Sequence, residues 1–124
     1  MSDVTTEELA RRLGEEGLVV LDVRSESEYR GEAGYPCDAR HGHVPGARNV
    51  DVNVLVAARA EELRELVGAP AGAEVIAYCH SGGRSGVAVQ LLCEAGYEAR
   101  NYEGSWHEWS ASPELPIEAE PAGD

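Results

Sequence analysis

The stretch Cys79–Ser85 constrains the fold more than any other part of this sequence. It reads Cys-His-Ser-Gly-Gly-Arg-Ser, follows the apolar run Val75–Tyr78, and precedes a mostly apolar run over residues 87–95. A short apolar run, a glycine-containing loop and a longer apolar run are typical of a strand, a tight turn and a helix. The sequence therefore predicts an α/β unit with Cys79 at the carboxyl end of a buried strand.

The loop has the composition of an anion-binding site. Gly82 and Gly83 let backbone N–H groups turn inward without a Cβ clash, and successive inward N–H groups form an anion nest. The positive end of the following helix points at the same place. A thiol there is favoured as a thiolate, and Arg84 adds a fixed positive charge. We interpret Cys79 as an activated nucleophile, because a merely buried cysteine would leave the glycines and Arg84 unexplained.

Strands and helices alternate along the rest of the chain. Strands are expected over 18–21, 47–50, 75–78 and 99–102. Helices are expected to begin at Thr5 and to cover Ser25–Tyr29, 86–95 and 104–110. A further helix is expected along one apolar stripe made of Val56, Ala60, Leu63 and Val67. This alternation predicts an α/β fold with a central parallel sheet and helices on both faces. We expect one domain over 1–124, with a core over about 5–112 and a fraying, Pro- and Glu-rich tail over 113–124.

The chain is strongly acidic, with a net charge of −13 over 124 residues. Binding to nucleic acid is not expected, because phosphate contacts need clustered cations. No apolar run reaches the roughly 18 residues of a membrane span, and Met1–Val4 lacks the features of a signal peptide, so we expect a cytoplasmic protein without membrane contact. All ten basic residues are arginine, which indicates compositional bias of the source genome or a salt-adapted source.

Four segments, in order along the chain, resemble the motifs of one known family. They are Asp22–Arg24 with Glu28–Tyr29, Gly42–Val50, Cys79–Ser85 and Tyr102–Trp109. These segments are similar to those of the rhodanese-like sulfurtransferases, and the resemblance runs from about Thr5 to Ile117. It implies a rhodanese-like three-layer fold for a single rhodanese domain.

The resemblance also implies a thiosulfate sulfurtransferase activity. In this family the cysteine, here Cys79, takes a sulfane sulfur from a donor such as thiosulfate, becomes a persulfide, and passes the sulfur to cyanide or a thiol. The loop backbone is then expected to bind the donor or persulfide, through His80, Ser81, Gly82, Gly83, Arg84 and Ser85, with Arg84 steadying the negative charge. Two half-reactions through a covalent intermediate predict ping-pong kinetics. The resemblance implies no metal and no organic cofactor.

The sequence departs from the family pattern in places that concern the donor. The long segment 30–41 is similar to that of the C-terminal domains of tandem enzymes, so the chain resembles one catalytic half of such an enzyme. Ser81 and Glu28 occupy positions where tandem thiosulfate enzymes can carry further cations. Relatives that use mercaptopyruvate have an uncharged loop ending in threonine, whereas this loop carries Arg84. We therefore favour thiosulfate over mercaptopyruvate.

Other functions use similar residues. A phosphatase or arsenate reductase also places a cysteine and an arginine around an anion nest, but its loop is one residue longer than the one from Cys79 to Arg84. A binding module without activity would be expected to lack Cys79. A persulfide carrier that hands its sulfur to a partner protein stays open, and partner-dependent turnover would identify it.

Several residues near the loop have structural interpretations. Asp22 and Arg24 end a strand and are expected to pair with each other or with neighbours. His43 is interpreted as a turn residue. Trp106 and Trp109 are expected in the core, with a wall of the active-site pocket as the alternative for both.

The remaining cysteines and His80 are less constrained. Cys93 lies within an apolar helix and is expected in the core. Cys37 lies in the long loop over 30–42, near His41 and His43, but the spacing of these three residues matches no standard zinc pattern, so no metal site is expected. Two roles for Cys37 stay open: it is either a resolving thiol for Cys79 or an ordinary loop cysteine. His80 is either a cation of the loop or a solvated side chain.

Overall fold

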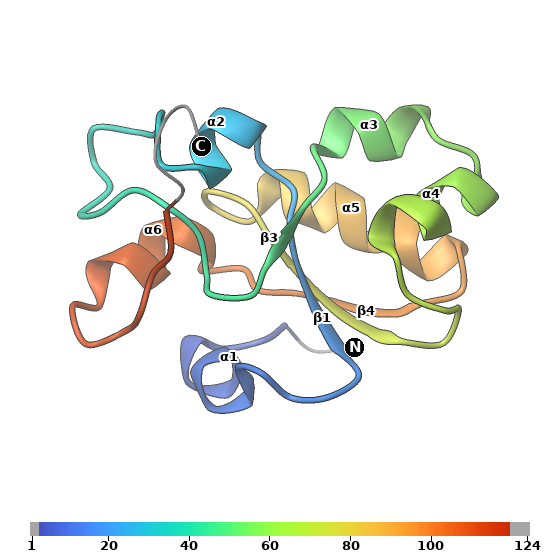
Figure 1. The fold of residues 1–124 in the computed structure, drawn as a ribbon, viewed down its shortest axis with the longest axis horizontal. Helices are drawn as coiled ribbons and strands as arrows, with labels where there is room; N and C mark the ends of the chain where they lie inside the picture. Colours follow the sequence, from blue (N-terminus) through green and yellow to red (C-terminus); the bar gives the residue numbers. More distant parts are fainter. Residues whose placement is uncertain (1–2, 120–124) are drawn as a thin grey trace.

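A four-stranded parallel sheet forms the centre of the computed structural model, which describes residues 3–119 (Figure 1). The strands are β1 (Leu18–Asp22), β2 (Arg48–Asn49), β3 (Glu74–Tyr78) and β4 (Glu98–Asn101), in the order β2-β1-β3-β4. All three strand pairs are parallel. The predicted α/β architecture with a central parallel sheet is confirmed.

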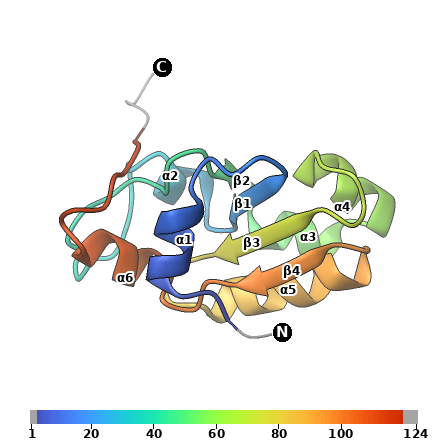
Figure 2. The ribbon, with the colours of Figure 1, turned by 90° about the horizontal axis from the view of Figure 1, so that it is seen from below.

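Helices cover both faces of the sheet, as predicted (Figures 1 and 2). α3 (Val52–Ala57), α4 (Ala60–Val67) and α5 (Gly83–Glu94) pack on one face, and α1 (Thr6–Arg12) and α6 (Ser105–Ala111) on the other. In β3, Val75 and Ala77 belong to the first core, whereas Ile76 and Tyr78 belong to the second. A continuous apolar strand is therefore buried on both sides, because successive side chains point to opposite faces.

Local capping signals fix the starts of two short helices. Thr5 Oγ1 accepts a hydrogen bond from the Glu8 N–H at the start of α1, as the sequence predicts. Ser25 precedes α2 (Glu26–Tyr29) and forms a reciprocal capping box with Glu28. This box holds Glu28 at the carboxyl edge of the sheet.

The helix predicted over 56–67 is two helices. Ala58 and Arg59 have extended backbone angles between α3 and α4, which breaks the helical stripe. Val56 is 59% exposed, and Val52 and Leu55 fill the core in its place. The prediction of one continuous stripe was wrong because Asp51 caps an earlier helix, α3. In that helix Val52 and Leu55 face the sheet, and Val56 does not.

α5 begins three residues before the predicted start and is buried along one side only. Ala88 and Leu92 face the sheet, whereas Val87 is 48% exposed. Cys93 is also exposed, so its assignment to the core was wrong. The helix is apolar on most sides, but only one face of it meets the sheet. No helix within residues 3–119 is long and apolar enough to cross a membrane.

The described part of the tail, residues 113–119, does not fray. The Trp109 indole N–H donates to the Pro116 carbonyl at 2.8 Å, and Glu118 pairs with His43 in an isolated β-bridge. Arg40 donates to four carbonyls around the end of α6, those of Trp109, Ser110, Ser112 and Leu115. The expectation of fraying was wrong for this part, and residues 120–124 lie outside the described range.

Candidate active site

Cys79 lies at the carboxyl end of β3, where the loop to α5 begins. Its backbone N–H donates to the Ser105 Oγ at 3.0 Å, and its carbonyl accepts from the Trp106 N–H at 2.9 Å. Both partners belong to α6, so the start of that helix fixes the Cys79 backbone from the side. Parallel sheets bind ligands at this edge, and Cys79 lies where the chain order reverses between β1 and β3.

Hydrogen-bond donors surround the sulfur of Cys79. The Gly82 N–H points at Sγ at 3.1 Å, and the Ser85 hydroxyl lies at 3.4 Å. Burial raises the pKa of the Cys79 thiol. Hydrogen bonds from the Ser85 hydroxyl and from the N–H groups of Ser85, Ser81 and Gly82 lower this pKa by more than burial raises it, so the pKa lies below its ordinary value. These donors favour the thiolate and are arranged to hold an anion on the sulfur.

Only 1% of Cys79 is exposed, although a thiolate that attacks a donor needs access to it. The backbone that supplies the donors wraps around the sulfur and covers it. Gly82 makes this tight loop feasible, because its φ is +97° and a Cβ there would lie 2.8 Å from the Glu103 carbonyl oxygen. The same residue is the N-cap of α5, whose positive end therefore lies beside the sulfur.

Arg84 does not face the site as an unopposed cation. Its guanidinium makes a two-point ion pair with Glu28 of α2, at 2.9 and 3.2 Å. The pair raises the pKa of Arg84, and the negative charge of Cys79 contributes in the same direction. Glu28 thus offsets part of the charge of Arg84, which the sequence interpretation did not include.

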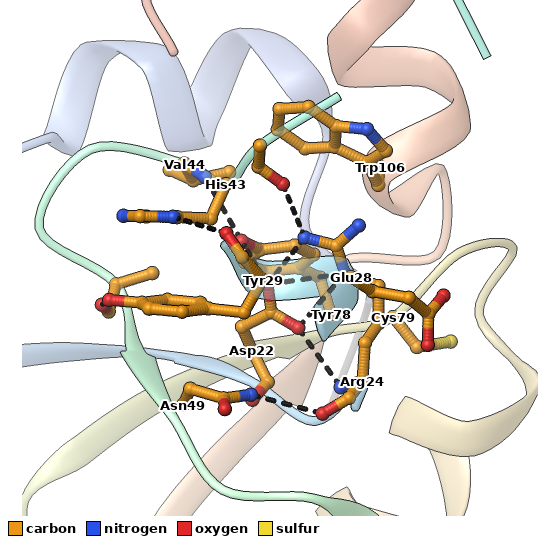
Figure 3. A network of polar contacts seen from close by, with 12 residues as sticks. Asp22, Arg24, Glu28, Tyr29, His43, Val44, Asn49, Tyr78, Cys79 and Trp106 are labelled. Atoms are coloured by element: carbon orange, nitrogen blue, oxygen red, sulfur yellow. Dashed lines mark hydrogen bonds and ion pairs between the residues drawn. The ribbon is translucent and has the colours of Figure 1, made fainter. Parts of the chain in front are cut away.

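Asp22 and Arg24 form the predicted ion pair, and it is fully buried beside the site (Figure 3). Arg24 Nη2 lies 2.7 Å from Asp22 Oδ2 and 2.6 Å from the Gly42 carbonyl. The Tyr78 hydroxyl also donates to Asp22 at 2.8 Å. The guanidinium lies 5.0 Å from the Trp106 ring centre, and this tryptophan is completely buried, as expected for a core residue. The network ties the ends of β1 and β3 together.

His43 lies in an isolated β-bridge with Glu118, just before the turn at Pro45 and Gly46. Its Nδ1 lies 2.7 Å from the Tyr29 carbonyl, and its ring stacks on the Tyr29 ring with centroids 3.7 Å apart. The side chain is buried. His43 therefore fastens the second motif onto the end of α2.

The side chain of His80 contacts the long loop after α2. Its Nε2 lies 2.9 Å from Asp38 Oδ1, and its ring stacks on Tyr35 at 3.8 Å. Ser81 is exposed, and its backbone N–H is one of the groups that lower the Cys79 pKa. The structure thus separates the two residues: Ser81 belongs to the nest, whereas His80 connects the nest to the loop.

Cys37 does not meet the histidines considered from sequence. Its Sγ lies 4.0 Å from His80 Nε2 and 3.9 Å from His107 Nδ1. His41 instead contacts the Tyr35 carbonyl. Cys37, His41 and His43 thus form no cluster, because the loop places Cys37 beside residues that are distant in sequence.

Sequence reasoning missed Ser105, Asp38 and His107 as neighbours of the site. Ser105 links Cys79 to the Tyr102 carbonyl, to which its hydroxyl donates at 2.8 Å. Its φ of +55° is rare for a residue other than glycine, and such strain is often found at functional sites. The only signal in the sequence was its position within the fourth motif. Asp38 and His107 gave no signal, because their partners are far away along the chain.

This arrangement can perform nucleophilic chemistry at sulfur. A thiolate held by N–H and O–H donors is a nucleophile, and the same donors can stabilise negative charge on a second sulfur attached to it.

Known proteins match this chain in sequence. Residues 5–112 match the family described as the rhodanese-like domain. A thiosulfate sulfurtransferase of Pseudomonas aeruginosa is 36% identical over 123 residues, covering 92% of this chain and 45% of the relative. A probable 3-mercaptopyruvate sulfurtransferase of that species is 34% identical, covering 88% and 42%. Sulfur carrier protein TtuD of Thermus thermophilus is 38% identical, covering 79% and 40%.

A solved structure extends the comparison to the fold. The crystal structure of a probable thiosulfate sulfurtransferase aligns with a TM-score of 0.81 at 42% identity, over 96% of this chain and 47% of that one. The chain thus spans less than half the length of these relatives. Since the family match covers nearly all of the described fold, from the cap of α1 to the end of α6, this chain belongs to the rhodanese-like domain family.

Proposed function

We propose that this protein is a sulfurtransferase that moves sulfane sulfur from thiosulfate to a thiol or cyanide through a persulfide on Cys79. The observation that carries the proposal is the set of donors around the Cys79 sulfur. The Gly82 N–H at 3.1 Å and the Ser85 hydroxyl at 3.4 Å favour the thiolate that must attack. They remain in place to hold the anionic persulfide that results.

The reaction divides into two displacements at sulfur. The Cys79 thiolate attacks the outer sulfur of thiosulfate, the S–S bond of the donor breaks, and sulfite leaves with the bonding electron pair. Cyanide or a thiolate then attacks the terminal sulfur of the persulfide, and the Cys79 thiolate leaves with its electron pair. No electron acceptor is consumed, because the sulfur is transferred rather than oxidised.

Arg84 is the charge near the loop that favours an anionic donor such as thiosulfate. Arg84 is a permanent cation in the loop and senses the charge of Cys79, so an anionic donor gains attraction there. Glu28 offsets this attraction through its ion pair with Arg84. A net charge of −13 opposes anionic substrates further, so donor binding depends on the loop itself. The 3-mercaptopyruvate relative makes that donor the alternative to be assayed in parallel.

A persulfide carrier is the second candidate function. It is supported by the similarity to a relative named sulfur carrier protein, and by the enclosure of Cys79, which is only 1% exposed. A carrier would accept sulfur readily but release it fast only to a partner protein. Turnover with small acceptors therefore separates the two candidates.

The direct test is thiocyanate formation from thiosulfate and cyanide. The proposal expects turnover with ping-pong kinetics, and its complete loss in Cys79→Ser with the fold retained. Cys93→Ser is the matched control, because Cys93 is an exposed cysteine on the outside of α5, and it should keep wild-type rates. Thiocyanate formation by Cys79→Ser would contradict the mechanism.

A further inference from the structure

Four side chains with metal-binding atoms converge beside the active-site loop. Cys37 and Asp38 come from the long loop after α2, His80 from the turn after β3, and His107 from α6. One ligand atom from each lies within 4.8 Å of each of the others. The two histidine segments are also joined directly, because the His107 N–H donates to the His80 carbonyl at 3.0 Å.

The separations within this group match those around a tetrahedral zinc ion. Zinc bonds of about 2.3 Å to sulfur and about 2.0–2.1 Å to nitrogen and oxygen place sulfur and nitrogen about 3.6 Å apart, and nitrogen and oxygen about 3.3 Å apart. Cys37 Sγ lies 3.9 Å from His107 Nδ1 and 4.0 Å from His80 Nε2. Asp38 Oδ1 lies 2.9 and 3.4 Å from the same two nitrogens. These four of the six edges are therefore within about half an ångström of the tetrahedral value, and the other two are no longer than 4.8 Å.

Asp38 provides an independent indication that this cluster binds a cation. Its side chain is 1% exposed, and Oδ1 faces both imidazoles. Oδ2, in contrast, is buried and has no hydrogen-bond partner. A buried carboxylate oxygen without a partner is costly, because the charge has lost its water without compensation. A divalent cation among the four side chains would supply the compensating charge.

We propose that Cys37, Asp38, His80 and His107 bind one zinc ion in a structural site that ties the long loop to the active-site turn. One thiolate, two imidazoles and one carboxylate form the borderline donor set that zinc accepts, and four protein ligands close the tetrahedron. This site replaces the metal-free interpretation of the sequence. It also gives the long loop a function, and it removes Cys37 from the role of a resolving thiol, because its sulfur is a zinc ligand.

The position of the site gives it a consequence for the nest. His80 follows Cys79 directly in the chain, so zinc bound to His80 would fix the residue next to the nucleophile. The Tyr35 ring, which stacks on His80 at 3.8 Å, already restricts the imidazole from the loop side. Preorganised imidazoles lower the entropic cost of metal binding.

Cobalt(II) provides the test, because it reports its ligands in the absorption spectrum. Metal-free full-length protein titrated with cobalt should show a thiolate-to-cobalt charge-transfer band and intense tetrahedral d–d bands that saturate at one equivalent. Zinc should then abolish both. Competition with a chromophoric chelator gives the zinc affinity. We expect Cys37→Ser and His107→Gln each to weaken it by more than the roughly 10–100-fold that loss of an outer-shell partner costs, because each variant removes a ligand. Circular dichroism establishes that each variant is folded.

Two control variants make the assignment specific. His41→Gln changes an exposed histidine of the same loop outside the cluster, and it should keep the bands and the affinity. Cys79→Ser should keep them as well, since the proposed ligand sulfur is that of Cys37. Loss of the thiolate band in Cys79→Ser but not in Cys37→Ser would overturn the proposal, as would wild-type protein that shows no saturable tetrahedral spectrum.

Discussion

The guanidinium of Arg84, in the loop that begins at Cys79, and the carboxylate of Glu28 form a two-point ion pair, at 2.9 and 3.2 Å. Arg84 is the only permanent cation in the loop Cys79–Ser85, so under the proposed function the pair would set how much positive charge an anionic donor meets. Glu28 in turn is positioned by its capping box with Ser25. The proposed function thus makes the strength of donor binding depend partly on the start of α2, which positions Glu28.

Removing the charge of Glu28 should therefore strengthen donor binding. We expect Glu28→Gln to lower the KM for thiosulfate by about threefold to tenfold, the effect of about 1 kcal/mol from one partly exposed charge. Glu26→Gln, on the same helix and with its side chain 76% exposed, removes the same net charge and should change KM little. Steady-state thiocyanate assays of both variants measure the difference. An unchanged KM in Glu28→Gln would contradict this role for the pair.

Arg84→Ala should have the opposite effect. Loss of the guanidinium removes the attraction for the donor and leaves Glu28 unpaired next to the loop, so KM for thiosulfate should rise. The free energy of unfolding should fall by no more than about 1 kcal/mol, because the Arg84 side chain is 34% exposed. Thiocyanate kinetics and urea unfolding of the same variant provide both values. A large loss of stability with an unchanged KM would show that Arg84 is structural.

The pair should also make stability sensitive to acid. Burial raises the pKa of Glu28, but hydrogen bonds from Arg84 and the Ser25 N–H lower it to about 2, against 4.5 for an ordinary glutamate. As the pH falls from 4.5 toward 2, the unfolded chain takes up a proton at this position that the folded protein does not, so the free energy of unfolding falls. Urea titrations over this range should show a smaller loss for Glu28→Gln than for wild type. Equal losses of unfolding free energy in the two proteins would contradict a lowered pKa for Glu28.

The buried pair of Asp22 and Arg24 should be essential for folding stability. The Asp22 carboxylate is 0% exposed. In Arg24→Met it keeps two donors among the described residues, the Tyr78 hydroxyl and the backbone N–H of residue 24, and it loses the opposite charge. We expect a loss of about 3–5 kcal/mol in the free energy of unfolding. Adding Asp22→Asn to that variant should restore part of the loss, because it removes the uncompensated charge. Chemical unfolding of both variants checks this, and a loss under about 1 kcal/mol in the single variant would disagree with it.

Much of this fold follows from local signals. The apolar run before Cys79, the glycines after it, and the caps at Thr5 and Ser25 all act over a few residues, and the structure has the elements that they predict. These signals are reliable because the favourable contacts form within the element itself.

The misplaced residues depend on contacts that are distant in sequence. Cys93 is exposed because the sheet meets only one side of α5, and an almost uniformly apolar helix does not indicate which side that is. The neighbours of Cys37 could not be predicted either, since His80 and His107 lie far along the chain. In the same way the ion pair of Arg84 joins two motifs that were predicted separately.

The central claim is that Cys79 carries the transferred sulfur. Intact-protein mass spectrometry after incubation with thiosulfate, before and after addition of cyanide, tests it most directly. The account predicts a gain of one sulfur atom, ~32 Da, that maps to Cys79, disappears with cyanide, and is absent from Cys79→Ser. No gain in the wild-type protein with either thiosulfate or mercaptopyruvate, or a gain that persists in Cys79→Ser, would contradict it.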